Sequence, residues 1–394
     1  MNNSLVEQKL DRLINDIAFV KSRMSSYLGG QEALGYLVDE TPIFVNTNDI
    51  GCPINVLNGG RYEEDYLSIL ASYRRRWTTV LDVGANLGIY SLRMASMCRT
   101  GRILAFEPIS RIRNLFARSV YLNNFSHIID IQPFALSDTD GEVALSIPAH
   151  HAGGASLDGG DGRSEFVQVR TLDQLVDGAF TCDLVKLDVE GHEHKALKGM
   201  MGVLRRSPSC VVLFEKLLQN SGSETEILRL CDDLGWGIYA VDRLRLSRVG
   251  AAEFLTTAGY FIAGRPVVVE DGGLDRGFLD VFPSDLNVLA GQVESGWLKV
   301  AEMPGKGGII FHGPYWYLPK GFYRLEFDGE ISGGIIVTIA EQFGYRVEDL
   351  KLNGTKPVVE FPVNRDLCKF ELVCRSTAKT GSMALHKIRL TRMA

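Results

Sequence analysis

The chain has 394 residues, of which 45% are apolar and 23% are charged. This length exceeds that of a typical single domain, and the composition is that of a folded globular protein rather than a disordered one. The formal net charge is −6, from 42 basic and 48 acidic residues. The chain therefore lacks the broad positive field that DNA or RNA requires, and nucleic acid is not an expected partner.

Seven cysteines are scattered along the chain without a Cys-x-x-Cys pair, and several lie in apolar runs. We interpret them as buried, reduced thiols. Charged residues such as Glu7, Lys9 and Asp11 interrupt the N-terminal segment where a signal peptide needs an apolar core, and no later run approaches transmembrane length. We expect a cytoplasmic protein without a transmembrane segment.

Residues 1–30 predict a coiled-coil helix. Apolar side chains recur in alternating steps of four and three, at Val6, Leu10, Leu13, Ile17, Val20, Met24 and Tyr27, and Gly29-Gly30 ends the pattern. Polar residues fill the other positions, so we expect this helix to form a homo-oligomer. One amphipathic helix packed on its own globular domain is the alternative.

A regular alternation of elements follows a preamble of short strands at 41–54 and a helix that ends near Trp77. Strands are expected at 80–83, 102–106 and 128–133, with helices at 87–98 and 111–123 between them. Such alternation is typical of a doubly wound α/β sheet.

Residues 136–169 break this rhythm with glycine-rich turns between strand-like pieces, and they predict a flexible insertion beside the site. The alternation resumes with a helix at 171–176, for which Thr171 is the candidate N-cap. A strand at 183–187, a helix at 193–204, a strand at 211–214 and a helix at 223–234 follow, and weak strands near 237–241 and 259–262 close the series.

The composition shifts to Gly, Pro and Asp around residues 265–285, which suggests a linker. From Gly296 onward short alternating runs predict an all-β sandwich, with strands at 323–327, 334–339, 358–363, 370–374 and 385–390. We therefore expect an oligomerisation helix at 1–30, an α/β domain at 38–265, a linker at 266–290 and a β-sandwich domain at 291–394.

The first predicted α/β strand runs into a glycine-containing turn, Asp82-Val83-Gly84-Ala85-Asn86-Leu87-Gly88. Such a turn lets backbone amides and a helix N-terminus approach a polar ligand, because glycine tolerates positive φ. Glu107 ends the next strand, where its carboxylate could bind ribose hydroxyls, as in NAD sites. The turn lacks the third glycine of the pyrophosphate fingerprint, which favours a smaller cofactor without pyrophosphate.

Acidic residues end four of the predicted strands, at Asp82, Glu107, Asp188 and Glu215. Asp188 and Glu190 lie two residues apart, so both could point into the crevice at the carboxyl edge of the sheet. One acidic residue at a strand end is often only a helix cap. Four acidic residues at successive strand ends favour a ligand-binding site over four separate helix caps.

The runs LDVGANLGIYSL, AFEP, FALSDTDG and LVKLDVEGHEHKAL occur in this order and resemble the FkbM family of S-adenosylmethionine-dependent methyltransferases over roughly residues 39–261. The resemblance implies a class I methyltransferase Rossmann-like sheet and methylation of an oxygen, commonly a sugar or natural-product hydroxyl. It also implies that S-adenosyl-L-methionine is held by Asp82, Gly84, Asn86 and Gly88, its ribose by Glu107, and its adenine near Ala135, Leu136 and Asp138.

The family usually has a small residue at the position of His192, so this histidine adds a candidate base. The cofactor is already a strong methyl donor, and the protein mainly aligns the acceptor hydroxyl and takes its proton. Asp188, Glu190 or His192 could be that base. Glu190, His192 and Glu193 could instead hold a divalent metal ion, which we do not favour. His150 and His151, in the glycine-rich insertion, could close over the substrate.

The run from Phe311 to Tyr323 is similar to the HGPYxxLPxGxY run of β-sandwich modules attached to bacterial surface-glycan enzymes. This implies a glycan-binding module, although its aromatic residues could equally be core or intersubunit contacts. The leading hypothesis is an O-methyltransferase that acts on a sugar or glycan hydroxyl in surface polysaccharide or glycoconjugate biosynthesis. The alternatives are a catalytically inactive glycan-binding scaffold and a nicotinamide-dependent oxidoreductase.

Overall fold

The computed structural model describes residues 24–73, 77–97, 101–148, 154–155, 157, 163–217, 223–242, 245–266, 269, 278–283, 286–318, 321–341, 345–364 and 367–393. One compact unit covers Arg23–Asp275, and a second contains Arg276–Ala394. The division between them falls inside the segment that the sequence predicts as a linker. No helix in the described ranges is long and apolar enough to cross a membrane.

A small antiparallel sheet opens the first unit, formed by β1 (Ser26–Gly29), β2 (Glu32–Tyr36) and β3 (Pro42–Asn46). The predicted N-terminal helix is wrong at its end, because Ser26–Gly29 form strand β1. Gly30 and Gln31, at φ of 58° and 68°, form the turn between β1 and β2. The rest of that helix, residues 1–23, lies outside the described residues.

Two helices, α2 (Cys52–Leu57) and α3 (Glu64–Tyr73), lead from this sheet to the main one. The strands expected up to residue 54 therefore end too late. Pro53 stands in the first turn of α2, where its fixed φ and missing N–H suit the start of a helix.

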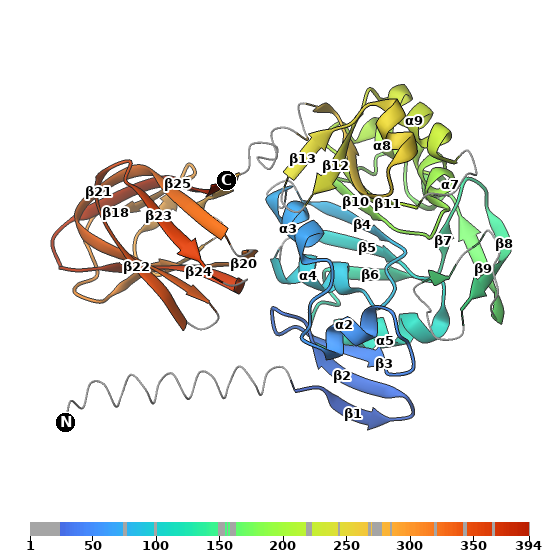
Figure 1. Cartoon of the computed structure of the whole chain (residues 1–394), viewed down its shortest axis with the longest axis horizontal. Helices are drawn as coiled ribbons and strands as arrows, with labels where there is room; N and C mark the ends of the chain where they lie inside the picture. Colours follow the sequence, from blue (N-terminus) through green and yellow to red (C-terminus); the bar gives the residue numbers. More distant parts are fainter. Residues whose placement is uncertain are drawn as a thin grey trace. The chain divides into compact units, whose positions relative to one another are not determined.

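The main sheet has eight strands in the order β13-β12-β14-β11-β10-β4-β5-β6 (Figure 1). Its members are β4 (Thr79–Val83), β5 (Arg102–Phe106), β6 (Ile129–Gln132), β10 (Leu184–Leu187), β11 (Val211–Lys216), β12 (Gly237–Asp242), β13 (Arg245–Arg248) and β14 (Gly259–Gly264). The strands β6, β5, β4, β10 and β11 pair in parallel, and β14 is antiparallel to both β11 and β12. The sheet is thus Rossmann-like and mixed, as expected.

Helices α4 (Ile89–Met97), α5 (Ser110–Leu122) and α9 (Ser223–Leu234) match their predicted positions closely, and α6 (Leu172–Leu175) does so within two residues. The central strand β10 is buried along its whole length, as expected for a strand covered on both faces. The pattern did not predict β13 or the short helix α10 (Ala251–Thr256).

The helix predicted at 193–204 is two helices, α7 (Glu193–Lys198) and α8 (Met201–Arg206). The Asp173 carboxylate accepts the backbone N–H groups of Gly202 and Val203 at 2.8 and 2.7 Å. These bonds satisfy amides at the start of α8, so a residue distant in sequence stabilises a second helix start.

The strand-like pieces of the predicted insertion form an antiparallel hairpin, β8 (Gly141–Ile147) and β9 (Arg163–Arg170), to which β7 (Ala135–Leu136) adds a third strand. The predicted lid residues His150 and His151 lie outside the described residues.

The second unit holds one antiparallel, barrel-like sheet of eleven strands rather than a sandwich. The strands are β15 (Phe278–Val281), β16 (Asn287–Val288), β17 (Gln292–Glu294), β18 (Trp297–Val300), β19 (Ile309–His312), β20 (Pro314–Leu318), β21 (Gly321–Glu341), β22 (Tyr345–Thr355), β23 (Val358–Val363), β24 (Leu367–Ser376) and β25 (Ser382–Met393). The predicted strands 323–327 and 334–339 are one strand, β21, which pairs first with β25 and then with β24. Gly333, at φ 78°, lets this long strand change partners without ending.

Candidate active site

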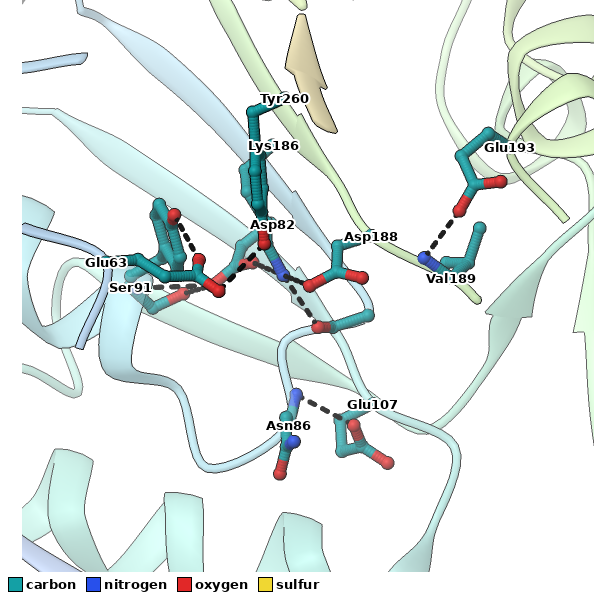
Figure 2. Close-up of polar contacts among 12 residues, drawn as sticks. Glu63, Asp82, Asn86, Ser91, Glu107, Lys186, Asp188, Val189, Glu193 and Tyr260 are labelled. Atoms are coloured by element: carbon teal, nitrogen blue, oxygen red, sulfur yellow. Dashed lines mark hydrogen bonds and ion pairs between the residues drawn. The ribbon is translucent and has the colours of Figure 1, made fainter. Parts of the chain in front are cut away.

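A cavity of about 290 Å³ opens at the carboxyl ends of β4, β5, β10 and β11. The chain order in the sheet reverses between β4 and β10, and open α/β sheets bind ligands at such a switch point. The turn after β4, the start of the loop after β5, strand β7 and the loop after β10 line the cavity, together with side chains from the region before α3 and from β14. Figure 2 shows polar contacts in this region, among them those of Glu63, Glu107 and Lys186.

The turn after β4 lies against the loop after β10. Gly84 and Asn86 adopt φ of 74° and 51°, and a Cβ at Gly84 would lie 1.9 Å from the carbonyl oxygen of Asp188. Only glycine fits at this position. A Cβ at Gly88 would collide with the ring of Phe116 at 2.0 Å, so Gly88 serves the packing of α5 on the turn and does not line the cavity.

Glu107 ties the turn to the end of β5. Its Oε2 accepts the backbone N–H of Asn86 at 2.8 Å (Figure 2). Its Oε1 accepts the backbone N–H of Ile109 at 2.7 Å. The side chain is only 4% exposed but borders the cavity. Burial raises the pKa of Glu107 to about 7, against the two amide bonds, which lower it.

Lys186 connects the two acidic strand ends from within β10. Its Nζ donates to the carbonyl oxygen of Gly84 at 3.0 Å and lies 3.3 Å from Asp188 Oδ2 and 3.8 Å from Asp82 Oδ1. Burial alone lowers the pKa of this ammonium, but Asp188 and Asp82 outweigh it and raise the pKa above its ordinary value. The sequence interpretation missed Lys186, although a lysine inside an apolar strand needs a buried partner and is a usable signal.

Asp82 lies behind the cavity wall rather than in it. The side chain is 0% exposed, and its Oδ2 accepts the amide of Ser91 at 3.1 Å and the Ser91 hydroxyl at 2.6 Å. Burial raises the pKa of Asp82, although Lys186 opposes that rise. Asp82 fastens the start of α4 beneath the turn.

Three more carboxylates line the same cavity and make up its acidic part, on Asp188, Glu190 and Glu215. Burial, followed by the charges of Asp188 and Glu215, raises the pKa of Glu190 to about 7. Burial and the charge of Asp188 likewise raise the pKa of Glu215 to about 7. Groups with such values exchange protons near neutral pH.

Glu193 and His192 shape the loop after β10 and do not line the cavity. Glu193 Oε1 accepts the amides of Val189 and Gly191 at 3.1 and 3.2 Å, which holds Glu190 at φ 54°. His192 is 4% exposed, with its Nε2 3.0 Å from the Ser137 hydroxyl oxygen. Within the described ranges, no group of three His, Cys, Asp or Glu side chains could hold a metal ion.

Glu63 joins three distant parts of the chain at the cavity wall. Its Oε2 accepts the hydroxyl of Tyr90 at 2.6 Å, and its Oε1 accepts that of Tyr260 at 2.8 Å. The Tyr260 ring in turn stacks on Tyr66, with centroids 3.9 Å apart. The sequence interpretation did not single out Glu63, since the bonds that reveal it span 27 and 197 residues.

Only part of the predicted adenine region lines the cavity. Ala135 and Leu136 line the cavity beside the apolar side chains of Ile109 and Leu145. Asp138 instead forms an ion pair with Lys198 Nζ at 2.9 Å. Of the predicted site residues, the structure thus brings seven to the cavity wall, Gly84, Asn86, Glu107, Ala135, Leu136, Asp188 and Glu190, and places Asp82, Gly88, Asp138 and His192 outside it.

The cavity lining thus combines apolar side chains, the carboxylate of Glu107, and two carboxyl groups, on Glu190 and Glu215, that can exchange a proton near neutral pH. Comparison with known proteins agrees with this organisation. Residues 82–235 match the family model of the methyltransferase FkbM domain.

Two curated relatives match parts of the chain. The hexuronic acid methyltransferase AglP of Haloferax volcanii is 27% identical over 189 residues, which cover 44% of this chain and 74% of AglP. Methyltransferase 1 of Beauveria bassiana is 26% identical over 160 residues, 40% of this chain and 60% of that protein's length. Among solved structures, the O-methyltransferase TomG from Streptomyces achromogenes aligns with a TM-score of 0.32 at 15% identity, covering 52% of this chain and 79% of TomG.

Proposed function

Residues 82–235 are an FkbM methyltransferase domain with the S-adenosylmethionine-binding fold, and from this premise we propose that the chain is an O-methyltransferase for a sugar or glycan hydroxyl. The observation that carries the proposal is the single cavity in which the turn after β4 and Glu107 face the carboxylates Asp188, Glu190 and Glu215. Cofactor and acceptor can meet there in one space.

The residues of the cavity suit S-adenosylmethionine. The apolar side chains of Ile109, Leu136 and Leu145 provide a slot for adenine, and Glu107 can accept ribose hydroxyls through lone pairs that its two amide bonds leave. Because Gly84 has no Cβ, the turn after β4 can lie directly against the loop after β10. The acidic end favours the positive sulfonium and amino groups.

When bound, the cofactor supplies a methyl group on a sulfonium, which becomes a neutral thioether once the methyl has moved to the acceptor oxygen. The chain's own task is to fix the acceptor hydroxyl in line and to take its proton. We propose that Glu190 is the base that takes this proton from the acceptor hydroxyl. Asp188 is instead held in an ion pair by Lys186 at 3.3 Å.

Glu190 is the better base because its raised pKa of about 7 lies close to a neutral working pH. Asp188 then has an electrostatic role beside the cofactor, and His192 has no direct role, since it does not reach the cavity. This narrows the three base candidates of the sequence to one.

A sugar acceptor is supported by the chemistry of the wall and by one relative. Tyrosine rings and carboxylates, here Tyr62, Tyr260, Glu63 and Glu215, are the groups that stack on sugar rings and accept their hydroxyls. AglP is by name a hexuronic acid methyltransferase. We also propose that the protein works in the cytoplasm, which the free thiols of the described cysteines favour.

The test is transfer of a labelled methyl group from S-adenosylmethionine to nucleotide sugars and lipid-linked oligosaccharides by the purified chain. We expect a methyl ether and S-adenosylhomocysteine in equal amounts with wild type, and a large loss of turnover with Glu190→Gln at unchanged cofactor affinity. S-adenosylhomocysteine, and not NAD, should raise the unfolding temperature. Stabilisation by NAD alone would instead favour the oxidoreductase, and binding without transfer would favour the scaffold.

A further inference from the structure

The charges that line the cavity are strongly unequal. Five carboxylates border it, on Glu63, Glu107, Asp188, Glu190 and Glu215, whereas the only cationic side chain among its described lining residues is Lys186. Glu107 belongs to the cofactor end, beside the turn after β4. Asp188 has the role beside the cofactor given above. The remaining three, on Glu63, Glu190 and Glu215, line the part of the cavity that we assign to the acceptor.

Lys186 does not offset this excess. Its ammonium already lies near two carboxylates, 3.3 Å from Asp188 and 3.8 Å from Asp82, and it donates to the Gly84 carbonyl. The side chain is also 4% exposed, so it cannot turn toward an incoming anion. Its positive charge is therefore paired with these two carboxylates and does not stabilise an incoming anion.

Glu63 is fixed in place at the acceptor end. Hydroxyls of Tyr90 and Tyr260 donate to its two oxygens, which fixes the position of the carboxylate. Glu190 and Glu215 line the same cavity. After the larger effect of burial, the charge of Asp188 raises the pKa of both, and the charge of Glu215 further raises that of Glu190. A further negative charge that enters this cavity would therefore lie close to several carboxylates.

We propose that the acceptor is a polyhydroxylated molecule with no negative charge near the reacting hydroxyl, and that Glu190 and Glu215 reject uronic acids and other anionic acceptors. The inference rests on the proposed function, since it concerns the acceptor of that reaction. A neutral or amino sugar gains hydrogen bonds from the carboxylates, whereas a second carboxylate must enter beside like charges in a partly dehydrated space.

This specificity differs from what the name of AglP says of that protein. The chain therefore shares a methyl-transfer scaffold with a hexuronic acid methyltransferase but has a wall suited to the opposite kind of substrate. Glu215 is the specificity residue to test, because it lines the acceptor end and is not the base.

The experiment measures the dissociation constants of S-adenosylhomocysteine and sinefungin, which carries a protonated amine where the cofactor carries its methyl group. At pH 8, above the raised pKa values, we expect wild type to prefer sinefungin at least about tenfold, because the amine faces ionised carboxylates. Glu215→Gln should lower that preference at least about threefold, since one charge is lost. Glu253→Gln, an exposed glutamate on α10, is the matched control and should leave it unchanged.

Methyl β-glucoside, methyl β-glucosaminide and methyl β-glucuronide are then compared as ligands of the protein loaded with S-adenosylhomocysteine. A preference for the glucuronide overturns the inference, as does an unchanged sinefungin preference in Glu215→Gln. If none of the glycosides binds, the sinefungin comparison alone decides. Failure of both sinefungin and S-adenosylhomocysteine to bind would instead refute the proposed function itself.

Discussion

Lys186→Met tests whether the buried ammonium holds the cofactor turn and the acidic strand end together. The substitution keeps the length and apolar stem of the side chain but removes the charge that faces Asp82 and Asp188 and the bond to the Gly84 carbonyl. Asp82 is 0% exposed, so its carboxylate loses its only ion-pair partner among the described residues without gaining water.

Removing one partner of a buried ion pair costs about 3–5 kcal/mol, because the other charge stays buried. We expect a loss of at least about 3 kcal/mol, which lowers the unfolding temperature by roughly 6–12 °C for a unit of this size. The loss should shrink as the pH falls. In the variant the folded-state pKa of Asp82 lies above its unfolded value, so the carboxylate destabilises the fold at high pH and is protonated at low pH.

Differential scanning calorimetry between pH 5 and pH 8 measures both effects. Lys198→Met is the matched control, since Lys198 makes an ion pair of similar length with Asp138 at 2.9 Å but is 53% exposed. Exposed pairs contribute about 0–1 kcal/mol. A loss below about 1 kcal/mol in Lys186→Met, or one that does not depend on pH, would refute this account of the wall.

Three further predictions concern the turn, the base and the N-terminal segment. Gly84→Ala should weaken S-adenosylhomocysteine binding at least about tenfold by calorimetry, because its Cβ meets the Asp188 carbonyl at a strained φ; Gly141→Ala, where a Cβ meets nothing, should bind normally. Turnover should rise with pH through about 7 as Glu190 loses its proton, and a profile that is flat there, or falls, would exclude Glu190 as the base. Leu13→Asp should turn an oligomer into a monomer in light scattering, whereas a wild-type monomer would contradict the predicted coiled coil.

The sequence predicted the sheet well because its strands carry an unambiguous pattern. Most of its parallel strands are short, largely apolar runs, and three of them are followed or ended by an acidic residue, Glu107, Asp188 or Glu215. Helices with the 3.6-residue period lie between several of them. Failures occurred where local patterns are compatible with two structures. Ser26–Gly29 fits the end of a heptad and also an edge strand, and only the partner strand β2 decides between them.

Pairing between strands distant in sequence also explains why two predicted strands of the C-terminal unit are in fact one strand, β21. The two runs within Gly321–Glu341 have the length of ordinary strands, and the glycines between them look like a turn. Pairing with β25 on one side and β24 further along keeps them as one strand, and strand pairing cannot be read from local composition.

The site was predictable where function depends on backbone shape and strand ends. The turn glycine Gly84, Glu107 and the pair Asp188 and Glu190 follow from the topology of a parallel sheet. The roles of Lys186 and Glu63 depend on contacts between segments up to 197 residues apart. No periodicity in the chain contains that information.

The most direct test of the central claim is nuclear magnetic resonance of a glycan after incubation with the chain and methyl-labelled S-adenosylmethionine. The account predicts a labelled O-methyl signal on a sugar that carries no carboxylate, formed by wild type and absent with Glu190→Gln. A label on a uronic acid, or an equal signal with Glu190→Gln, would contradict it.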